Sequence, residues 1–195
     1  IIVTVQSTVT GGTIASAQTI CSGGDPLAFT ESASSSGSGA LTYAWKQSTD
    51  GYAATLGTSS TYDVLSGLSS TTQYRRVTTS TLGGVACTAN SNNIEVSVNS
   101  VTAGTISSSQ TICSGGDPAA FTQSVASSGS GTLSYEWRYS TDGYASTLAT
   151  SATYDVSSGL TSSTTYRRIT ISTLGAALCS ATSNDITVTI NSLIV

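Results

Sequence analysis

The chain has 195 residues, of which 38% are hydrophobic and only 8% are charged, and its net charge at pH 7 is −4. Six Lys and Arg residues are too few to build the basic patch that binds nucleic acid, so we expect no nucleic-acid partner. No run of 18 apolar residues is present, which predicts no membrane insertion. The absence of His removes the commonest acid–base catalyst and metal ligand.

Short runs rich in Val, Ile, Tyr and Thr are separated by turn residues along the first half of the chain, which is typical of β-sandwiches. The turns fall at residues 22–26, 36–39 and 50–51, where Gly and Asp tolerate turn conformations. No segment has a sustained helical period, so we predict an all-β fold. The expected strands lie near residues 13–21, 27–33, 41–48, 54–57, 61–64, 72–81 and 93–99.

A repeat sets the organisation of the chain. Moving the sequence by 92 residues superimposes residues 9–100 on residues 101–192 without a gap, and 62 of the 92 positions are identical. Residues 1–7 match the end of each repeat, so we interpret residues 1–8 as the last strand of a preceding module. Residues 193–195 then begin a following module. The sequence therefore predicts two modules, residues 9–100 and 101–192, taken from a longer array.

Two aromatic landmarks refine the predicted fold. Trp45 lies in the middle of the third strand, where immunoglobulin-like domains bury a core Trp. Tyr74 follows Leu68 by six residues, which resembles the tyrosine corner of those domains. Trp137 and Tyr166 repeat both features. We therefore predict tandem immunoglobulin-like Greek-key sandwiches of about seven strands each, with these four aromatics in their cores.

The four cysteines occupy equivalent places in the two repeats, as Cys21 and Cys113, and as Cys87 and Cys179. This pattern predicts disulfides formed in an oxidising compartment. Pairing within modules would join Cys21 to Cys87 and Cys113 to Cys179, and we favour it because self-contained modules fold without register errors. Pairing across modules, Cys21 with Cys179, is the alternative. It would leave Cys87 and Cys113 to bond outside this chain.

No pattern in the sequence predicts catalysis. The many Ser and Thr residues lack a base, since a Ser nucleophile needs His or Lys beside it and the chain has one Lys, Lys46. The acids repeated at turns are not clustered as calcium ligands are, so we expect no cofactor and no metal, although calcium at the module junctions stays open. The candidates for ligand binding are surface aromatics and basic residues that could hold a sugar, namely Tyr52, Tyr144, Arg75 and Arg167.

Several blocks resemble one known group of proteins. They are residues 12–26 and 104–118 (Gly-Thr-Ile to Cys-Ser-Gly-Gly-Asp-Pro), 41–51, 61–64 and 74–77. Together they resemble the immunoglobulin-like repeats of giant Bacteroidetes surface proteins, including gliding-motility adhesins of the SprB type. The resemblance implies export by type IX secretion, an extracellular position on the cell surface and service in a filament or adhesin. It implies no catalytic residues.

We predict from these features a non-enzymatic structural or spacer repeat of an extracellular surface filament. The link at residues 99–102 runs directly from one last strand into the next first strand, which indicates a stiff rod. The expected partners are adjacent modules of the same chain, with surface glycans or lateral filament contacts as further possibilities. The alternative function is a carbohydrate-binding module. Donation of residues 1–7 to a neighbouring chain, as in a polymerising pilus, is disfavoured because covalent repeats already give continuity.

Overall fold

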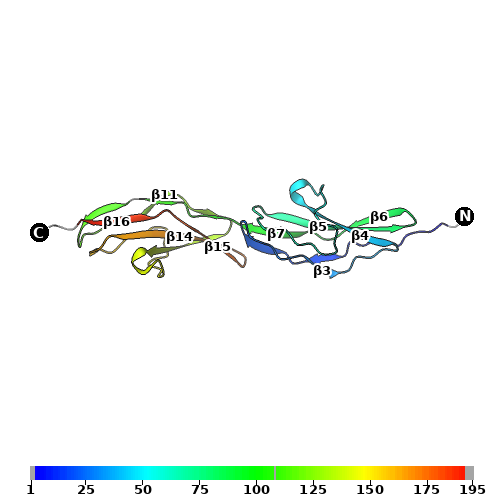
Figure 1. Cartoon of the computed structure of the whole chain (residues 1–195), viewed down its shortest axis with the longest axis horizontal. Helices are drawn as coiled ribbons and strands as arrows, with labels where there is room; N and C mark the ends of the chain where they lie inside the picture. Colours follow the sequence, from blue (N-terminus) through cyan, green and yellow to red (C-terminus); the bar gives the residue numbers. More distant parts are fainter. Residues whose placement is uncertain (1–2, 108, 192–195) are drawn as a thin grey trace. The chain divides into compact units, whose positions relative to one another are not determined.

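The computed structural model describes residues 3–107 and 109–191 and separates into two compact units, Ile1–Val98 and Asn99–Val195. Figure 1 shows both units built from strands, with two single-turn helices, η1 (Ser48–Asp50) and η2 (Ser140–Asp142). The all-β prediction is therefore confirmed. The predicted start of a following module, residues 193–195, lies outside the described residues.

The first unit contains a two-stranded sheet and a five-stranded sheet. In the small sheet β1 (Thr13–Ala15) pairs with β3 (Thr30–Ala33). The large sheet has the order β2-β7-β5-β4, and β6 also pairs with β5. Its strands are β2 (Gln18–Cys21), β4 (Ala40–Gln47), β5 (Thr72–Leu82), β6 (Val85–Asn90) and β7 (Ile94–Asn99).

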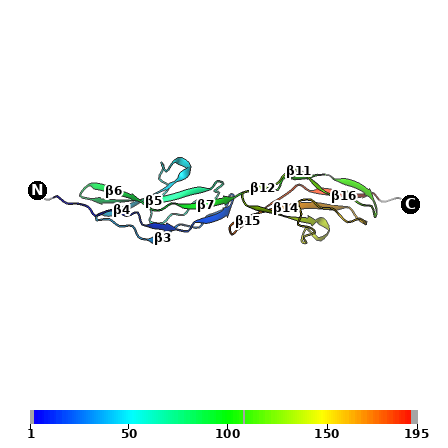
Figure 2. The same cartoon turned by 180° about the vertical axis from the view of Figure 1, so that it is seen from behind.

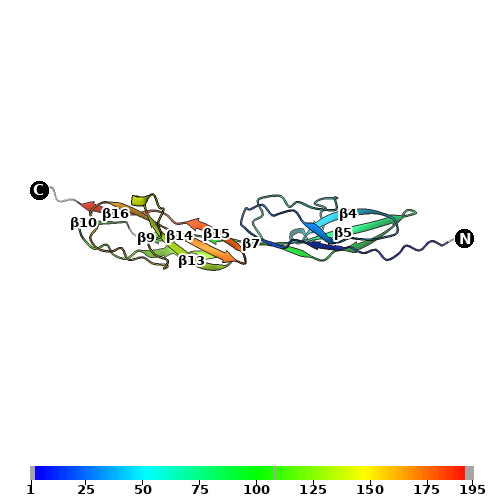
Figure 3. The ribbon, with the colours of Figure 1, turned by 90° about the horizontal axis from the view of Figure 1, so that it is seen from below.

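The second unit repeats this plan, as Figure 2 shows from behind. Its large sheet has the order β10-β16-β14-β13 with β15 beside β14, and its small sheets pair β9 with β11 and β8 with β12. The strands are β8 (Val101–Thr102), β9 (Thr105–Ser107), β10 (Gln110–Cys113), β11 (Thr122–Val125), β12 (Ser128–Gly129), β13 (Thr132–Tyr139), β14 (Thr164–Leu174), β15 (Ala177–Thr182) and β16 (Ile186–Asn191). In Figure 3 the hairpin β14–β15 and its neighbour β13 are seen from below.

The strands differ from the predicted ones at several places. The predicted strand 13–21 is two strands, because Ser16 has a φ of 85° and interrupts the extended backbone. Residues 54–57 and 61–64 contribute only isolated bridges, Gly57 to Trp45 and Tyr62 to Phe29. No strand is assigned to residues 3–8, the described part of the predicted strand 1–8, since a strand needs a neighbour with which to pair.

β6, the strand that contains Cys87, is absent from the predicted strands. A two-residue turn, Gly83 and Gly84 with φ of 58° and 83°, joins β5 to β6. Two consecutive glycines between β-rich runs are a recognised hairpin signal, because both turn residues need positive φ. The Gly-Gly pair was therefore a signal for a hairpin at this point. Residues 85–90 form its second strand, which was not among the predicted strands.

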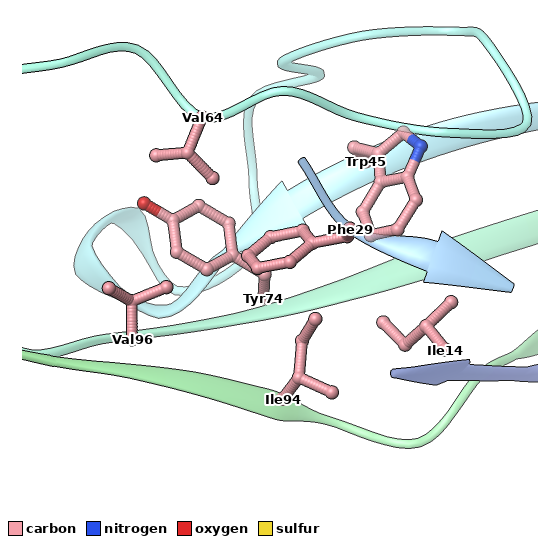
Figure 4. Close-up of a cluster of buried hydrophobic side chains, with 7 residues drawn as sticks. All are labelled: Ile14, Phe29, Trp45, Val64, Tyr74, Ile94 and Val96. Atoms are coloured by element: carbon pink, nitrogen blue, oxygen red, sulfur yellow. The ribbon is translucent and has the colours of Figure 1, made fainter. Parts of the chain in front are cut away.

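A cluster of aromatic and aliphatic side chains fills each sandwich. In the first unit Trp45 and Phe29 are fully buried and Tyr74 is 1% exposed. Figure 4 shows the Phe29 and Tyr74 rings next to each other, with Val64 above them in the view and Val96 and Ile94 below. Trp137 and Tyr166 occupy the same places in the second cluster. The indole N–H of Trp45 donates to the Ser59 carbonyl at 2.9 Å, so the one polar atom of the ring is satisfied.

Candidate functional site

A fully buried arginine lies beside the aromatic core of the first unit. Alternate residues of β5 face inward, which places Arg76 inside and Arg75 outside. The Arg76 guanidinium donates to the Ser60 carbonyl at 2.7 Å, the Gly11 carbonyl at 3.1 Å and the Glu31 carboxylate at 2.6 Å. Since Glu31 lies in the small sheet and Arg76 in the large one, this side chain joins the two layers.

The environment of Arg76 explains how its charge is tolerated. A buried charge costs several kcal/mol unless a counter-charge and hydrogen bonds compensate it. Arg76 also lies over the Tyr43 ring, with 4.7 Å between the guanidinium carbon and the ring centroid. The hydrogen bond from Arg76 in turn holds the pKa of Glu31 below its usual value. The arginine is therefore a structural crosslink with its counter-charge in place.

The second unit keeps the arginine but not the carboxylate. Arg168 donates to the Ala152 and Ala103 carbonyls, both at 2.8 Å, and lies 4.9 Å from the Tyr135 ring centroid. Gln123 stands at the position of Glu31 and accepts from the Ser127 N–H at 3.3 Å, just as Glu31 accepts from the Ser35 N–H at 3.1 Å, so the backbone bond is shared and the arginine contact is not. Among the described residues no ion pair involves Arg168, and burial lowers its pKa.

The outward-facing arginines cover the candidate sugar-binding aromatics. The guanidinium carbon of Arg75 lies 3.9 Å from the Tyr52 ring centroid, and that of Arg167 lies 3.7 Å from Tyr144. Arg167 also pairs with Asp185 at 2.8 Å. One face of each ring is therefore occupied by a neighbouring side chain. The structure brings the four candidates together as two stacked pairs, one in each unit.

The cysteines do not pair as we favoured. Cys87 and Cys113 carry free thiols, whereas Cys21 and Cys179 are disulfide-bonded. Pairing within modules is therefore wrong. The alternative, Cys21 with Cys179, stays a prediction.

Strand register gives the physical reason in the second unit. Cys179 lies opposite Ser172 on β14, whereas Cys113 lies opposite Asn191, three residues beyond the pair of Val188 with Thr164. The two cysteines are thus about eleven residues, or roughly 35 Å, apart along the sheet. A disulfide needs Cα atoms within about 7 Å. The two cysteines of one module are therefore too far apart to bond, although a disulfide within each module would have made the module self-contained.

A buried asparagine at the start of the second unit was not singled out by the sequence analysis. Asn99 is fully buried; its amide donates to the Ser172 and Ala177 carbonyls at 2.8 and 3.0 Å, and its oxygen accepts from the Ser172 hydroxyl at 2.6 Å. In the first unit Gln6 takes this place and donates to the Val85 carbonyl at 2.6 Å. Asn99 is near the end of the first sequence repeat but lies in the second compact unit, so each of these side chains closes the hairpin of the module that follows it in the sequence.

Each unit has a surface hollow at the equivalent place. One of about 390 Å³ lies beneath the loop before β14, and one of about 290 Å³ lies beneath the loop before β5. Tyr154 and Tyr166 line the first, and Tyr62 and Tyr74 line the second. Burial raises the pKa of all four phenols, so they are neutral hydroxyls. A third hollow, of about 600 Å³, borders Cys87.

The described residues contain no cluster of three or more His, Cys, Asp or Glu side chains placed to hold a metal ion. They also contain no helix long and apolar enough to cross a membrane. The notable side chains of the described residues connect one part of a module to another. They are the buried arginines, the hairpin-closing amides, the stacked Tyr–Arg pairs and the cysteines at the two ends of each module.

Comparison with known proteins relates the chain to a family and to a fold. A family model described as "Domain of unknown function (DUF8696)" matches residues 10–100 and again residues 102–192. No curated protein matches the chain.

Two solved structures share the fold. One holds three N-terminal domains of the highly immunogenic outer capsid protein Hoc of bacteriophage RB49, with a TM-score of 0.52 and 10% identity over 91% of this chain and 69% of that one. An I-band fragment of titin is similar with a TM-score of 0.51 and 14% identity over 97% of this chain and 67% of that one. These likenesses confirm tandem immunoglobulin-like sandwiches.

Proposed function

The chain belongs to the family described as a domain of unknown function, DUF8696, with one copy in each module, and we propose that these modules are load-bearing spacers in an extracellular surface filament or adhesin. The proposal assigns no catalytic activity to either module. It also retains the resemblance to Bacteroidetes surface repeats, and with it type IX secretion, gliding motility and attachment at the cell surface.

The observation that carries the proposal is the pairing of an early strand with the last strand. In the second unit β10 runs parallel to β16, with Gln110 opposite Val188 and Cys113 opposite Asn191. In the first unit β2 likewise neighbours β7. Tension on the two ends of a module pulls such strands in opposite directions along their length. Their hydrogen bonds are then loaded together rather than one after another, which is the geometry that resists extension.

The internal crosslinks support the same role. Arg76 fastens the small sheet to the large one through three hydrogen bonds, and the Arg168 network repeats part of this. Disulfide-bonded Cys21 and Cys179 suit an oxidising compartment, which is the support for an extracellular location. Only Ser100 separates β7 from β8, so little chain is available to extend without loading a strand.

Single-molecule force spectroscopy of the two-module chain tests the proposal. We expect two cooperative unfolding events at forces well above those of modules in which strands are unzipped. Thr111→Pro and Ile112→Pro form a matched pair. Successive residues of the edge strand β10 point their N–H groups to opposite sides, so one of the two prolines removes a β10–β16 hydrogen bond and the other does not.

The two variants should therefore differ. One should lower the unfolding force of the second module, while the other leaves it near the original value and the unchanged first module serves as the internal reference. If neither variant changes the force, the β10–β16 ladder does not bear the load and the proposal fails.

Glycan binding at Tyr52 and Tyr144 is the alternative function and has less support. A sugar would stack on a tyrosine face that Arg75 or Arg167 already occupies. A glycan array probed with the chain and with its Tyr52→Ala, Tyr144→Ala double variant decides between the two. Binding that the double variant loses would favour the carbohydrate-binding module.

A further inference from the structure

The two free thiols of the chain stand at positions that form disulfides elsewhere in the same chain. Cys113 occupies in the second module the place that bonded Cys21 has in the first, and Cys87 occupies the place of bonded Cys179. We name Cys21 and Cys113 turn cysteines, since each precedes the Ser-Gly-Gly turn, and Cys87 and Cys179 hairpin cysteines. Each type of position therefore supports a disulfide in this fold.

We propose that Cys87 and Cys113 each bond a cysteine of the opposite type on a further module of this family, so that unlike cysteines link modules head to tail. The proposal stands on the cysteines themselves and goes beyond the load-bearing role. A contact between two different patches of a module is heterologous, and repetition of such a contact produces an open linear assembly rather than a closed pair.

The two thiols lie in complementary surroundings. Cys113 is exposed at the end of β10, and the turn after it is slender, since nothing lies within 4 Å of where a Cβ on Gly115 would be. Cys87 is half-buried on the wall of the hollow of about 600 Å³, beside Leu82 and Val85. A turn of small residues with open space around it suits a recessed thiol in a hollow of that size, whose lining also includes Thr4, Val5 and Gln6.

The position of the two types within a module sets the direction of linkage. In the second module the turn cysteine and the hairpin cysteine are separated by roughly 35 Å along the sheet, which is far beyond disulfide reach. One module therefore presents one cysteine of each type at opposite ends. Bonds between unlike types give every chain in the line the same direction, whereas bonds between like types would reverse the direction at each joint.

The bond requires an oxidant, and a small-molecule disulfide such as oxidised glutathione supplies that chemistry. The Cys113 thiolate attacks one sulfur of the oxidant and releases one glutathione thiolate. The Cys87 thiolate of another module then attacks the Cys113 sulfur of this mixed disulfide and releases the second glutathione. Two protein thiols lose two protons and two electrons, and one oxidant molecule becomes two glutathione thiols.

The isolated chain can test the proposal, because a second copy presents both thiols. After incubation with oxidised glutathione, a non-reducing gel should show a ladder of multiples of the monomer that reducing agent collapses. A protease that cleaves after glutamate cuts at Glu31, Glu95 and Glu136 and so places each of the four cysteines on its own peptide. Mass spectrometry should then find the Cys87 peptide joined to the Cys113 peptide.

Variants that each keep one of the two free thiols separate recognition from random collision. Cys87→Ser retains only the free turn cysteine and Cys113→Ser only the free hairpin cysteine. Mixed together, they should form the heterodimer about tenfold faster than either variant alone forms a homodimer, at equal total thiol. A control chain carrying Cys113→Ser, Cys87→Ser and Ser158→Cys gives the collision rate, because its new thiol is exposed at a position where neither module has a cysteine.

Each result decides the proposal. A heterodimer rate above the control, with the peptides of Cys21 and Cys179 unchanged, supports it. Heterodimers no faster than homodimers or the control, thiols that stay free in oxidised glutathione, or a Cys87–Cys113 bond within one chain would each overturn it. Failure here would leave the load-bearing role intact, since that role is measured by the β10–β16 variants.

Discussion

The two modules are identical at 62 of 92 positions, yet they satisfy the same buried arginine differently. In the first, Arg76 has two carbonyls and the Glu31 carboxylate as acceptors. In the second, Arg168 has two carbonyls, and Gln123 keeps only the bond from a backbone N–H that Glu31 also accepts. The two carbonyls and the aromatic face are therefore what both arginines require, and the carboxylate counter-ion is an addition in the first module.

The same contrast recurs at the end of each module where Asn99 and Gln6 lie. Asn99 uses both its amide and its oxygen, whereas the Gln6 oxygen is buried with no partner among the described residues. One module has the better-satisfied arginine and the other the better-satisfied amide. Hydrogen exchange followed by mass spectrometry reports on the modules separately, so it can measure each contrast within one chain.

Removing the arginines should give the largest effect. Arg76→Ala breaks an ion pair as well as two carbonyl bonds, so the first module should lose about 3 to 5 kcal/mol of unfolding free energy. Arg168→Ala breaks only the carbonyl bonds and removes a charge without a counter-ion, so the second module should lose about 1 to 3 kcal/mol. Urea titrations read by hydrogen exchange measure both. Equal losses would show that the Glu31 pair contributes nothing.

The hairpin-closing amides should give the next largest effect. Asn99→Ala leaves buried partners unsatisfied and should destabilise the second module by about 1 to 3 kcal/mol. Gln6→Ala removes one bond together with an unpartnered oxygen, so we expect less than about 1 kcal/mol in the first module. Exchange at the hairpins β5–β6 and β14–β15 is the readout. A Gln6 variant as costly as the Asn99 variant would contradict this ranking.

Acid should affect the modules unequally, and this is the smallest expected effect. The hydrogen bond from Arg76 lowers the pKa of Glu31 in the folded state. The pair therefore stabilises the first module above the ordinary glutamate pKa near 4.3, and this contribution is lost as the pH falls through the lowered folded value. Protection in the first module should fall below about pH 4 more than in the second, where Gln123 does not titrate.

Exchanging the two side chains provides the control for the acid experiment. Glu31→Gln should remove the acid sensitivity of the first module, and Gln123→Glu should introduce it into the second. If the first module keeps its sensitivity in the Glu31→Gln chain, another carboxylate is responsible.

Much of the fold could be predicted because repetition and alternation are local properties of the sequence. The 92-residue period, the two-residue alternation around Trp45 and the glycine turns all lie within short windows. The places that escaped prediction depend on partners distant in the chain. Residues 61–64 have strand composition but find only a bridge to Phe29, whereas residues 85–90 find a full neighbour in β5 and become β6.

The residues of the candidate site likewise fall into those that local sequence could predict and those that depend on distant partners. The Arg75–Arg76 doublet by itself determined that one arginine faces outward and its neighbour inward, because side chains alternate along a strand. The contact of Arg76 with Glu31, 45 residues away, and the identity of Cys87 and Cys113 as the free thiols follow from the three-dimensional fold and not from any local pattern. The cysteines show the reason most clearly: sequence gives their equivalence, but pairing depends on a distance of a few Å, and strand register sets that distance.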